Sequence, residues 1–493
     1  MSSATTPERT TDRRTISSRR LEMDEFLEQR GEVLAQRPGT EVDLEEATAH
    51  LRSLPREKNC AVALTEAKRE GRMLLQPRAA VDTIEAQITL LRWLQDEGGA
   101  DILPTQVDSY SRTLNFDAAE AGLAESQKTG RAKLNGFPFV AHGVDGTRRV
   151  TSELRKPLCM RQVTPDIRLV SEVALAGGYT GITSHAIDGT VSFSKDFPFD
   201  KAIGCYQYVD RLAAHYQEND VPIYREYRGL VDAVHLPPSL IIATSILEAL
   251  MGAAQGVKVM GVCSFVCGHM MQEVAGLRVL QRLADEYLHR LGHTDVTAFA
   301  VANHWLGQFP EDEPTAYALT SSATIAAVLG GASELIVKSV EEGKGIPSKE
   351  GNAATLRAVR AIARTFEVQG PILDVDQLQE EEHIIELEAR ALLDKSLELG
   401  DGDPALGTVR AFEAGALDCL LAPYRGLRGT IMIVRDGAGA MRYQAHGDLP
   451  LPQEAIDYNR SRLEARHRRD PGKADYELLI DDINVIAAGG LLY

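Results

Sequence analysis

The chain has few cysteines: six in 493 residues, most of them far apart (Cys60, Cys159, Cys205, Cys263, Cys267 and Cys419). This usage is typical of free thiols in a reducing compartment, and the N-terminus lacks the apolar segment of a secretory signal. We therefore expect a cytoplasmic protein. Cys263, Cys267 and His269 lie close together in the sequence. Because no second ligand pair stands at a matching spacing, buried thiols are a better interpretation than a metal site.

The sequence also lacks a long apolar run and an excess of positive charge. The most apolar stretch, residues 239–254, contains Glu248 and is predicted to be a buried helix rather than a membrane span. The 53 basic side chains are outnumbered by 71 acidic ones, which gives a net charge of −18. Since phosphate binding needs a basic face, nucleic acid is not expected as a partner, and neither is a membrane.

What the chain does have is the composition of an ordinary globular protein, with 44% hydrophobic and 25% charged residues. Between about residues 70 and 365, short apolar segments alternate with helical stretches, several of which end in Gly-Gly. The apolar segments are 72–76, 101–103, 158–160, 257–263, 297–302 and 335–338; the helical stretches are 81–96, 167–176, 237–254 and 321–329. This alternation predicts an α/β fold, and its length favours a (β/α)8 barrel. No G-x-G-x-x-G follows an early strand, which disfavours a dinucleotide-binding sheet.

The flanking regions differ in texture. Residues 1–20, rich in Ser, Thr and Arg, are expected to form a disordered tail, and residues 21–72 a helical segment. The barrel, with the active site, is assigned to 73–365, and a smaller α+β region to 366–493. That region contains a charged helix at 377–399, hairpin-like turns near residues 436 and 447, and a basic helix at 458–469. The acidic run 380–382 is interpreted as a solvated helix face rather than a metal site.

Three arginines follow candidate strands or lie in the loops after them: Arg78, Arg112 and Arg161. Because the chemistry of such barrels sits where strands end, all three could face one central site. Guanidinium groups there would grip carboxylate or phosphate through paired hydrogen bonds. The spacing alone equally allows three separate structural arginines.

Two further strand ends carry candidate residues. Lys338 ends one strand and Glu342 follows four residues later, a pair that could hold a sugar hydroxyl or a phosphate. The alternative is a local ion pair of little energetic weight. Asn303-His304-Trp305 ends another strand, where Trp305 would stack on a ligand if it were exposed. A tryptophan in the core is the commoner outcome.

Motifs spread from about residue 21 to Asn484 are recognisable together. They include QPRA (76–79), LLRWLQDEGGAD (90–101), LNGFP (134–138), GQFP (307–310) and GTVRAFEAG (407–415). In this order and spacing they resemble the large (epsilon) subunit of glutamate mutase, also called methylaspartate mutase. The resemblance implies a (β/α)8 barrel and an isomerase that converts L-glutamate into threo-3-methyl-L-aspartate by a radical mechanism.

The resemblance also implies partners and a cofactor. Adenosylcobalamin would lie between this chain and a small cobalamin-binding subunit, in a heterotetramer that contains a dimer of large subunits. The chain contains no D-x-H-x-x-G, the motif that supplies histidine to cobalt, so the small subunit is expected to bring it. No metal ligand is therefore expected in this chain. The cofactor would supply the difficult chemistry, and the protein binding and orientation.

Site residues carried over from the family fall into two groups. The substrate-binding positions are Arg78, Arg112 and Arg161, which clamp the carboxylates, together with Gln162, Thr183, Gly189 and Phe193. The cofactor-binding positions are Ala80, Asn135, Ser192, Phe309, Lys338, Glu342 and Ile346. Among these, the resemblance assigns the Lys338–Glu342 pair to the ribose of the adenosyl group.

The departures from the family pattern concentrate on the substrate's ammonium group. The family has Glu at Thr183, His at Gln162, and Tyr at both Gly189 and Phe193. It also has Pro at Ser192 and Gly at Ala80. Losing a carboxylate that binds an ammonium removes roughly 1.5–3 kcal/mol, which changes preference roughly tenfold to a hundredfold.

Three functions remain open at this point. The chain is a genuine glutamate mutase subunit, a mutase of a related dicarboxylate, or a binding or regulatory paralogue without turnover. His185 and Asp188, in the same loop as Thr183, are candidates to replace the missing glutamate.

Overall fold

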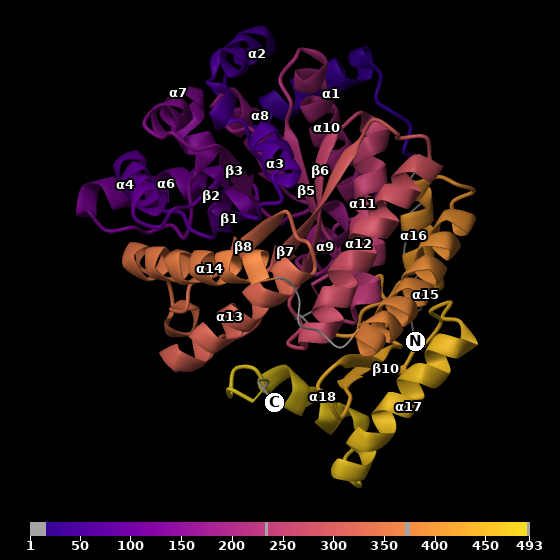
Figure 1. The fold of residues 1–493 in the computed structure, drawn as a ribbon. Helices are drawn as coiled ribbons and strands as arrows, with labels where there is room; N and C mark the ends of the chain where they lie inside the picture. Colours follow the sequence, from indigo (N-terminus) through magenta and orange to yellow (C-terminus); the bar gives the residue numbers. More distant parts are fainter. Residues whose placement is uncertain (1–15, 232–234, 370–374, 491–493) are drawn as a thin grey trace, which may run out of the picture.

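The computed structural model describes residues 16–231, 235–369 and 375–490, and Figure 1 shows the arrangement of their elements. Eight parallel strands form the central sheet, in the spatial order β1-β8-β7-β6-β5-β4-β3-β2. The strands are β1 (Leu74–Pro77), β2 (Leu103–Gln106), β3 (Leu158–Arg161), β4 (Gly181–Thr183), β5 (Tyr224–Arg228), β6 (Val259–Phe265), β7 (Thr297–Asn303) and β8 (Glu334–Val337). The β1 and β8 strands pair, and the Asp101 amide donates to the Leu75 carbonyl across the β1–β2 seam at 3.0 Å. The predicted (β/α)8 barrel is confirmed.

Helices cover the outside of this barrel (Figure 1). The long ones after successive strands are α4 (Ile84–Asp96), α6 (Phe116–Thr129), α7 (Phe139–Ser152), α8 (Arg168–Ala176), α10 (Phe199–Glu218), α11 (Pro238–Gln255), α12 (Met270–Arg290), α13 (Glu313–Leu329) and α14 (Lys349–Gln369). The loops at the carboxyl ends of the strands carry the short helices α5 (Ser109–Arg112) and α9 (Ala186–Val191) and the 3-10 turn η3 (Glu342–Lys344). These short elements surround the end of the barrel where barrel chemistry occurs.

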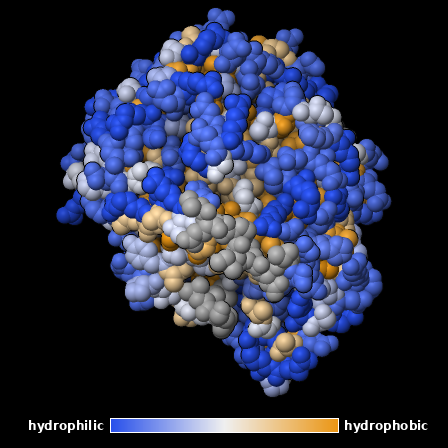
Figure 2. Space-filling view, in the orientation of Figure 1, coloured by the Kyte–Doolittle hydropathy of each residue, from blue (hydrophilic) through white to orange (hydrophobic). Residues whose placement is uncertain are grey.

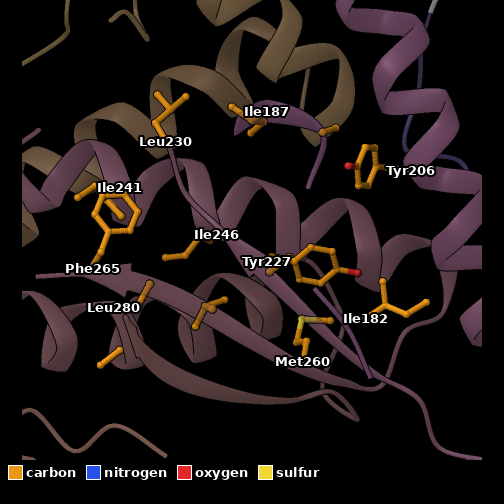
Figure 3. Packing of buried hydrophobic residues seen from close by; sticks show 14 of the residues in the cluster. Ile182, Ile187, Tyr206, Tyr227, Leu230, Ile241, Ile246, Met260, Phe265 and Leu280 are labelled. Carbon is orange, nitrogen blue, oxygen red and sulfur yellow. The ribbon is translucent and has the colours of Figure 1, made fainter. Parts of the chain in front are cut away.

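Alternation along the strands separates the barrel interior from the helix-facing core. Ile182, Tyr227 and Met260, on β4, β5 and β6, point into the packed apolar layer beneath the helices (Figure 3). Their neighbours Thr183 and Glu226 point the other way, because successive side chains of a strand lie on opposite faces. The interior therefore carries a group of polar side chains.

The amino end of the barrel is closed by α3 (Cys60–Arg69). Leu64 and Ala67 of this helix pack in one cluster with Tyr224 and Phe299 from the barrel interior. The Lys68 ammonium donates to the carbonyl of Ala298 at 3.0 Å, beside the same strand end. The helix covers the amino end of the barrel, so a ligand would have to reach the interior from the carboxyl end.

The N-terminal segment is helical, as predicted, with α1 (Met23–Ala35) and α2 (Leu44–Ser53) before α3. Part of the predicted disordered tail is ordered, however. The backbone amide of Ser18 donates to both carboxylate oxygens of Asp403, at 3.0 and 2.8 Å, and the Ser17 hydroxyl donates to the same carboxylate. The disorder prediction is therefore wrong for residues 16–20, because these hydrogen bonds fix the backbone. Residues 1–15 lie outside the described residues.

The apolar stretch around Glu248 forms α11, a helix of the interior. It is long and apolar enough to cross a bilayer, but 94% of it is buried inside the molecule. It packs against β5, β6, α12 and α15 (Val375–Leu399). A buried core helix is the structure that the sequence predicted.

The C-terminal region combines helices with one hairpin and packs on α11 and α12 (Figure 1). After α15 come α16 (Pro404–Ala414), β9 (Met432–Arg435), β10 (Met441–Ala445), α17 (Gln453–Arg469) and α18 (Asp475–Asn484). The β9 and β10 strands pair antiparallel around the predicted turn.

One interpretation of the acidic run is wrong. Glu381 is buried and paired with Arg442, whose Nη1 lies 3.0 Å from its carboxylate. Arg442 Nε also pairs with Asp436 at 2.9 Å. The run is therefore not a wholly solvated face, because its middle residue holds the hairpin to α15. Among the described residues there is also no group of three side chains able to hold a metal ion.

Candidate active site at the carboxyl end of the barrel

Three neighbouring strands place one residue each at the same level inside the barrel. The register pairs Arg161 of β3 with Thr183 of β4, and Thr183 with Glu226 of β5. Thr183 and Glu226 are at most 1% exposed, and Arg161 is 3% exposed. A buried charge needs a partner at such a position. The three side chains therefore form one bonded unit.

Arg161 is held by an end-on pair of hydrogen bonds to Glu226. Its Nη1 lies 2.8 Å and its Nη2 3.1 Å from the two carboxylate oxygens. The Thr183 hydroxyl donates to Glu226 at 2.8 Å and accepts from Arg161 at 3.0 Å. Burial opposes both charges, but the pairing outweighs it: the pKa of Glu226 is lowered and that of Arg161 raised. The arginine keeps Nε–H and one Nη2–H for a further anion.

Gln76 links this unit to a second carboxyl group deeper in the barrel. Its amide oxygen accepts from Arg161 at 2.7 Å, and its nitrogen donates to Glu334 at 2.6 Å. Tyr224 also donates to Glu334, at 2.7 Å. Burial, and then the nearby charge of Glu226, raises the pKa of Glu334, so its neutral form is favoured. These groups form a rigid polar floor under the site.

Arg78 follows β1 and carries an unbalanced charge. No hydrogen bond or ion pair joins it to a carboxylate of the described residues. Burial lowers its pKa to about 10, and the next causes are the positive charges of Arg161 and Arg228. Arg78, Arg161 and Arg228 are therefore close enough for their charges to repel one another. A dianion would relieve this mutual repulsion.

Arg112 lies at the end of α5, in the loop region after β2. It is half-buried, burial lowers its pKa, and the carboxylate of Asp108 is the charge that opposes this shift. Its Nε is buried without a hydrogen-bond partner. No contact joins Arg112 to Arg78 or Arg161 in the described residues, so its part in a common clamp stays a prediction.

Arg228, which sequence analysis did not select, anchors the loop of the predicted substrate contacts. Its Nη2 donates to Asp188 at 2.8 Å. The same carboxylate accepts from the Ser192 hydroxyl at 2.6 Å and the Val231 amide at 3.1 Å, and lies 3.3 Å from His185 Nε2. Asp188 thus has no free oxygen with which to replace the missing glutamate. Ser192, a predicted cofactor contact, is likewise used inside this loop.

His185 is uncharged near neutral pH. Burial and the charge of Arg228 lower its pKa to about 4, although Asp188 opposes the shift. Its Nδ1 lies 3.4 Å from the backbone amide of Arg228. A neutral imidazole enclosed in this way serves the loop rather than an ammonium group.

The other predicted substrate positions are placed around this end. Gln162 is 2% exposed, donates to the Thr164 hydroxyl at 3.0 Å, and has a buried amide oxygen without a partner. A Cβ on Gly189 would lie 2.9 Å from the Thr164 carbonyl oxygen, so any side chain there would require the backbone to move. Phe193 is 55% exposed.

Three predicted cofactor residues come together, Phe309 from the segment after β7 and two others from the segment after β8. Lys338 Nζ lies 3.0 Å from Glu342 and 5.1 Å from the centre of the Phe309 ring. Burial lowers the pKa of Lys338, while Glu342 opposes the shift. Buried ion pairing and cation–π contact fix the lysine more firmly than a surface pair would.

The remaining cofactor positions stand apart from this cluster. Ile346 is 87% exposed, and Ala80 is half-buried after β1. Asn135 is exposed and accepts from the Ser109 amide at 2.9 Å. They lie in loops at the same end of the barrel, but no contact joins them to Lys338.

The structure does not support the hypothesis that Trp305, in the segment Asn303-His304-Trp305, stacks on a ligand. Trp305 is 3% exposed and its indole donates to the Gln308 carbonyl at 3.0 Å, so it belongs to the core. Asn303 is fully buried, and neither atom of its carboxamide has a hydrogen-bond partner. Cys263 and Cys267 are buried thiols, as expected, and the His269 ring caps α12 by accepting from the Gln272 amide.

Buried polar atoms without a hydrogen-bond partner occur at several places in the described residues, and six of them lie at this end of the barrel. These six are Asp108 Oδ2, Arg112 Nε, Gln162 Oε1, Arg228 Nε and both carboxamide atoms of Asn303, from the ends of β2, β3, β5 and β7. Such atoms are rare in native proteins unless water or a ligand satisfies them. Together with the guanidinium groups, they fit a small, polar and anionic ligand.

The rim around these atoms is apolar in places. The face in Figure 2 is mostly hydrophilic, with hydrophobic residues in small separate groups. Of seven large exposed hydrophobic side chains among the described residues, four lie in loops or turns after β2, β4 and β8: Tyr110, Leu114, Phe193 and Ile346. Exposed apolar side chains around a polar centre are typical of a surface that another molecule covers.

Comparisons with known proteins agree on one family. The family model described as methylaspartate mutase E chain matches residues 54–493. The glutamate mutase epsilon subunit of Desulfitobacterium hafniense (strain Y51) is 41% identical over 478 residues, covering 97% of this chain and 99% of the relative. That of Treponema denticola is 39% identical over 476 residues, covering 96% and 98%.

Solved structures add little to this. An N-(5'-phosphoribosyl)anthranilate isomerase from Pyrococcus furiosus covers 59% of this chain and 100% of its own, at 10% identity and a TM-score of 0.31. A likeness of that size supports no conclusion beyond the strand pairing already described.

Proposed function

The chain belongs to the methylaspartate mutase E chain family, and from this premise we propose that it is the large subunit of an adenosylcobalamin-dependent enzyme that interconverts L-glutamate and threo-3-methyl-L-aspartate. The enzyme is a mutase, an isomerase that rearranges a carbon skeleton. Its partner would be a small cobalamin-binding subunit, and the assembly would contain two large subunits. The enzyme would be located in the cytoplasm. The six cysteines are buried and form no disulfide, which supports a reducing compartment.

The observation that carries this proposal is the meeting of an anion-binding interior with the Lys338 cluster at one end of the barrel. Lys338, Glu342 and Phe309 offer a donor, an acceptor and an aromatic face, which suit the hydroxyls and ring of a nucleoside. The chain therefore fits the adenosyl side of the cofactor. Bound adenosylcobalamin supplies the carbon radical that starts the rearrangement.

The residues of this chain bind and orient the substrate. Arg161 would offer its Nε edge to one carboxylate, while Glu226 keeps the guanidinium from rotating. Arg78, with no carboxylate of its own, gains most from a bound anion. Fixed charges in a buried site reorganise little during a reaction, which is how such a site contributes to rate.

A second candidate function is suggested by Thr183. Its hydroxyl is bonded to Glu226 and Arg161 and carries no charge. A dicarboxylate without an α-ammonium would need no carboxylate there, so a mutase of a related diacid is the alternative.

The test combines the chain with a small cobalamin-binding subunit, adenosylcobalamin and L-glutamate, and follows the new methyl signal of 3-methylaspartate by NMR. We expect turnover, and loss of it in Lys338→Met. The matched control is Lys344→Met, which removes an exposed lysine of the same loop that pairs with Glu313. Absence of turnover with glutamate, combined with rearrangement of a diacid that lacks the ammonium, would favour the second candidate.

A further inference from the structure

Asn303 is the last residue of β7 and faces the barrel interior. Phe299 packs with interior residues at the amino end, and Val301 packs with Cys263 and Ile336 inside the barrel. Asn303 continues this series at every second residue. Its neighbour His304 points outward, with Nε2 3.3 Å from the Thr324 hydroxyl of α13. The carboxamide therefore projects inward at the end of the barrel that holds the candidate site.

The carboxamide has no partner of its own. Asn303 is fully buried, and both its oxygen and its nitrogen lack a hydrogen bond. Leaving one buried polar group unsatisfied destabilises a protein by about 1–3 kcal/mol. A protein that retains two such atoms on one interior side chain has a use for them, and the use is to bind something that enters from the open end.

The charges nearby determine what can bind. Arg78, Arg161 and Arg228 give this end positive charge, whereas Glu226 and Asp188 are already paired with arginines. Carboxylates of a ligand therefore have guanidinium groups to meet. For an ammonium, the one buried carboxylate oxygen without a hydrogen-bond partner among the described residues at this end is Asp108 Oδ2, in the segment after β2. The carboxamide oxygen of Asn303 is a free neutral acceptor, and its N–H group is a donor beside it.

We propose that Asn303 binds the amino-acid end of the substrate, its oxygen accepting from the α-ammonium and its nitrogen donating to the α-carboxylate. This inference rests on the proposed function and selects an α-amino dicarboxylate over a plain one. Thr183 then needs no charge, because the ammonium is recognised from the opposite side of the barrel. The larger cofactor belongs at the rim, where Ile346 is exposed, rather than at this enclosed amide.

The experiment compares L-glutamate with glutarate, which differs from it only by the ammonium group. Binding is measured by calorimetry on the complex with a small cobalamin-binding subunit loaded with hydroxocobalamin, so that no turnover occurs. Wild type should prefer glutamate. Asn303→Leu should reduce that preference at least about tenfold, the effect of losing one or two hydrogen bonds to a charged group. Asn303→Asp should increase it, because an added carboxylate repels both diacids but attracts only the ammonium.

Thr324→Val is the matched control. It removes the hydroxyl of α13 that contacts His304, on the outer side of the strand end that carries Asn303, and it should leave the preference for glutamate unchanged. If Asn303→Leu does not fold, the nearly isosteric Asn303→Asp decides the question alone. An unchanged preference in the Asn303 variants, a wild type that prefers glutarate, or an effect confined to cobalamin affinity would each overturn the proposal. The proposed function is judged separately, by whether wild type with adenosylcobalamin turns over glutamate.

Discussion

Arg161 and Arg78 differ in what balances their charge, and this difference makes a residue-level prediction. Arg161→Ala leaves Glu226 buried without its counter-ion, so we expect it to destabilise the protein by about 3–5 kcal/mol. Arg78→Ala removes a cation that repels two other guanidinium groups and is attracted more weakly by Glu342 and Glu226, so stability should change little. Urea unfolding measures both. Both variants should also weaken diacid binding by roughly 2–3 kcal/mol. Equal stability losses in the two variants would contradict the arrangement described here.

Thr183→Glu introduces the residue that the resemblance to the family places at this position, but in this chain the new carboxylate would share Arg161 with Glu226. Two carboxylates at that distance cannot both ionise cheaply. The single variant should therefore unfold at lower urea, and Thr183→Glu/Glu226→Gln should recover most of the loss. Glu226→Gln alone is the control, because it weakens the pair without adding charge. If the single variant is as stable as wild type, the two side chains do not compete for the arginine.

The sequence predicts some of the residues at this site but not Glu226 or Arg228. Arg78, Arg161 and Lys338 are predicted because they end or follow recognisable apolar strands, and Glu342 because it follows Lys338 by four residues. Glu226 and Arg228 are missed because their strand reads Y-R-E-Y-R and shows no hydrophobic pattern. Their charges are compensated by residues on other strands, and such pairing is not visible in one chain segment. Alternation of charged and aromatic residues is the only local signal.

At the level of elements, Glu248 joins α11 to the loop that carries Asp188 and Gly189. Its carboxyl group accepts from the Ile187 amide at the start of α9. Burial raises its pKa to about 8 from an ordinary value of 4.5, although bonds from backbone amides oppose the shift. The folded protein therefore holds a proton that the unfolded chain releases.

We therefore expect the free energy of unfolding to fall as pH rises from about 5 to 8, because the unfolded chain ionises Glu248 and the folded protein does not. The fall due to this group is at most about 1.4 kcal/mol per pH unit. Glu248→Gln keeps the acceptor and removes the proton, so its stability relative to wild type should rise over that range. Urea unfolding at several pH values measures the difference. Glu32→Gln, on the exposed side of α1, should show no such trend. A constant difference for Glu248→Gln would contradict the buried neutral carboxyl.

The element boundaries were predictable to different degrees for physical reasons. The helices with an apolar stripe and a Gly stop, such as α8 and α11, match closely. The sequence does not predict β4, because three residues give too short a pattern. It does not predict β5 either, because charged residues alternate with aromatic ones along that strand. Residues 16–20 were placed in a disordered tail because their ordering comes from Asp403, 385 positions away from Ser18.

At the scale of the whole molecule, Asp403 fastens the N-terminal segment to the C-terminal region. It accepts from Ser17 and Ser18 while also capping α16 through the Ala405 and Leu406 amides. Asp403→Ala should release this segment and remove a cap worth about 1 kcal/mol. Trypsin should then cut faster after Arg19 or Arg20. Asp285→Ala, on exposed α12 surface, is the control, and equal cleavage rates would contradict the attachment.

The closure of the amino end by α3 has a consequence for traffic through the molecule. Because α3 covers the amino end of the barrel, a substrate that enters through the carboxyl end must leave, as product, through the same end. Under the proposed function the partner and its cofactor cover that end during the reaction. The substrate must then bind before the partner subunit covers the carboxyl end, and each product can leave only after that end is uncovered. Under the proposed function, this architecture would impose an order on the catalytic cycle, in which the subunit boundary opens before each product leaves.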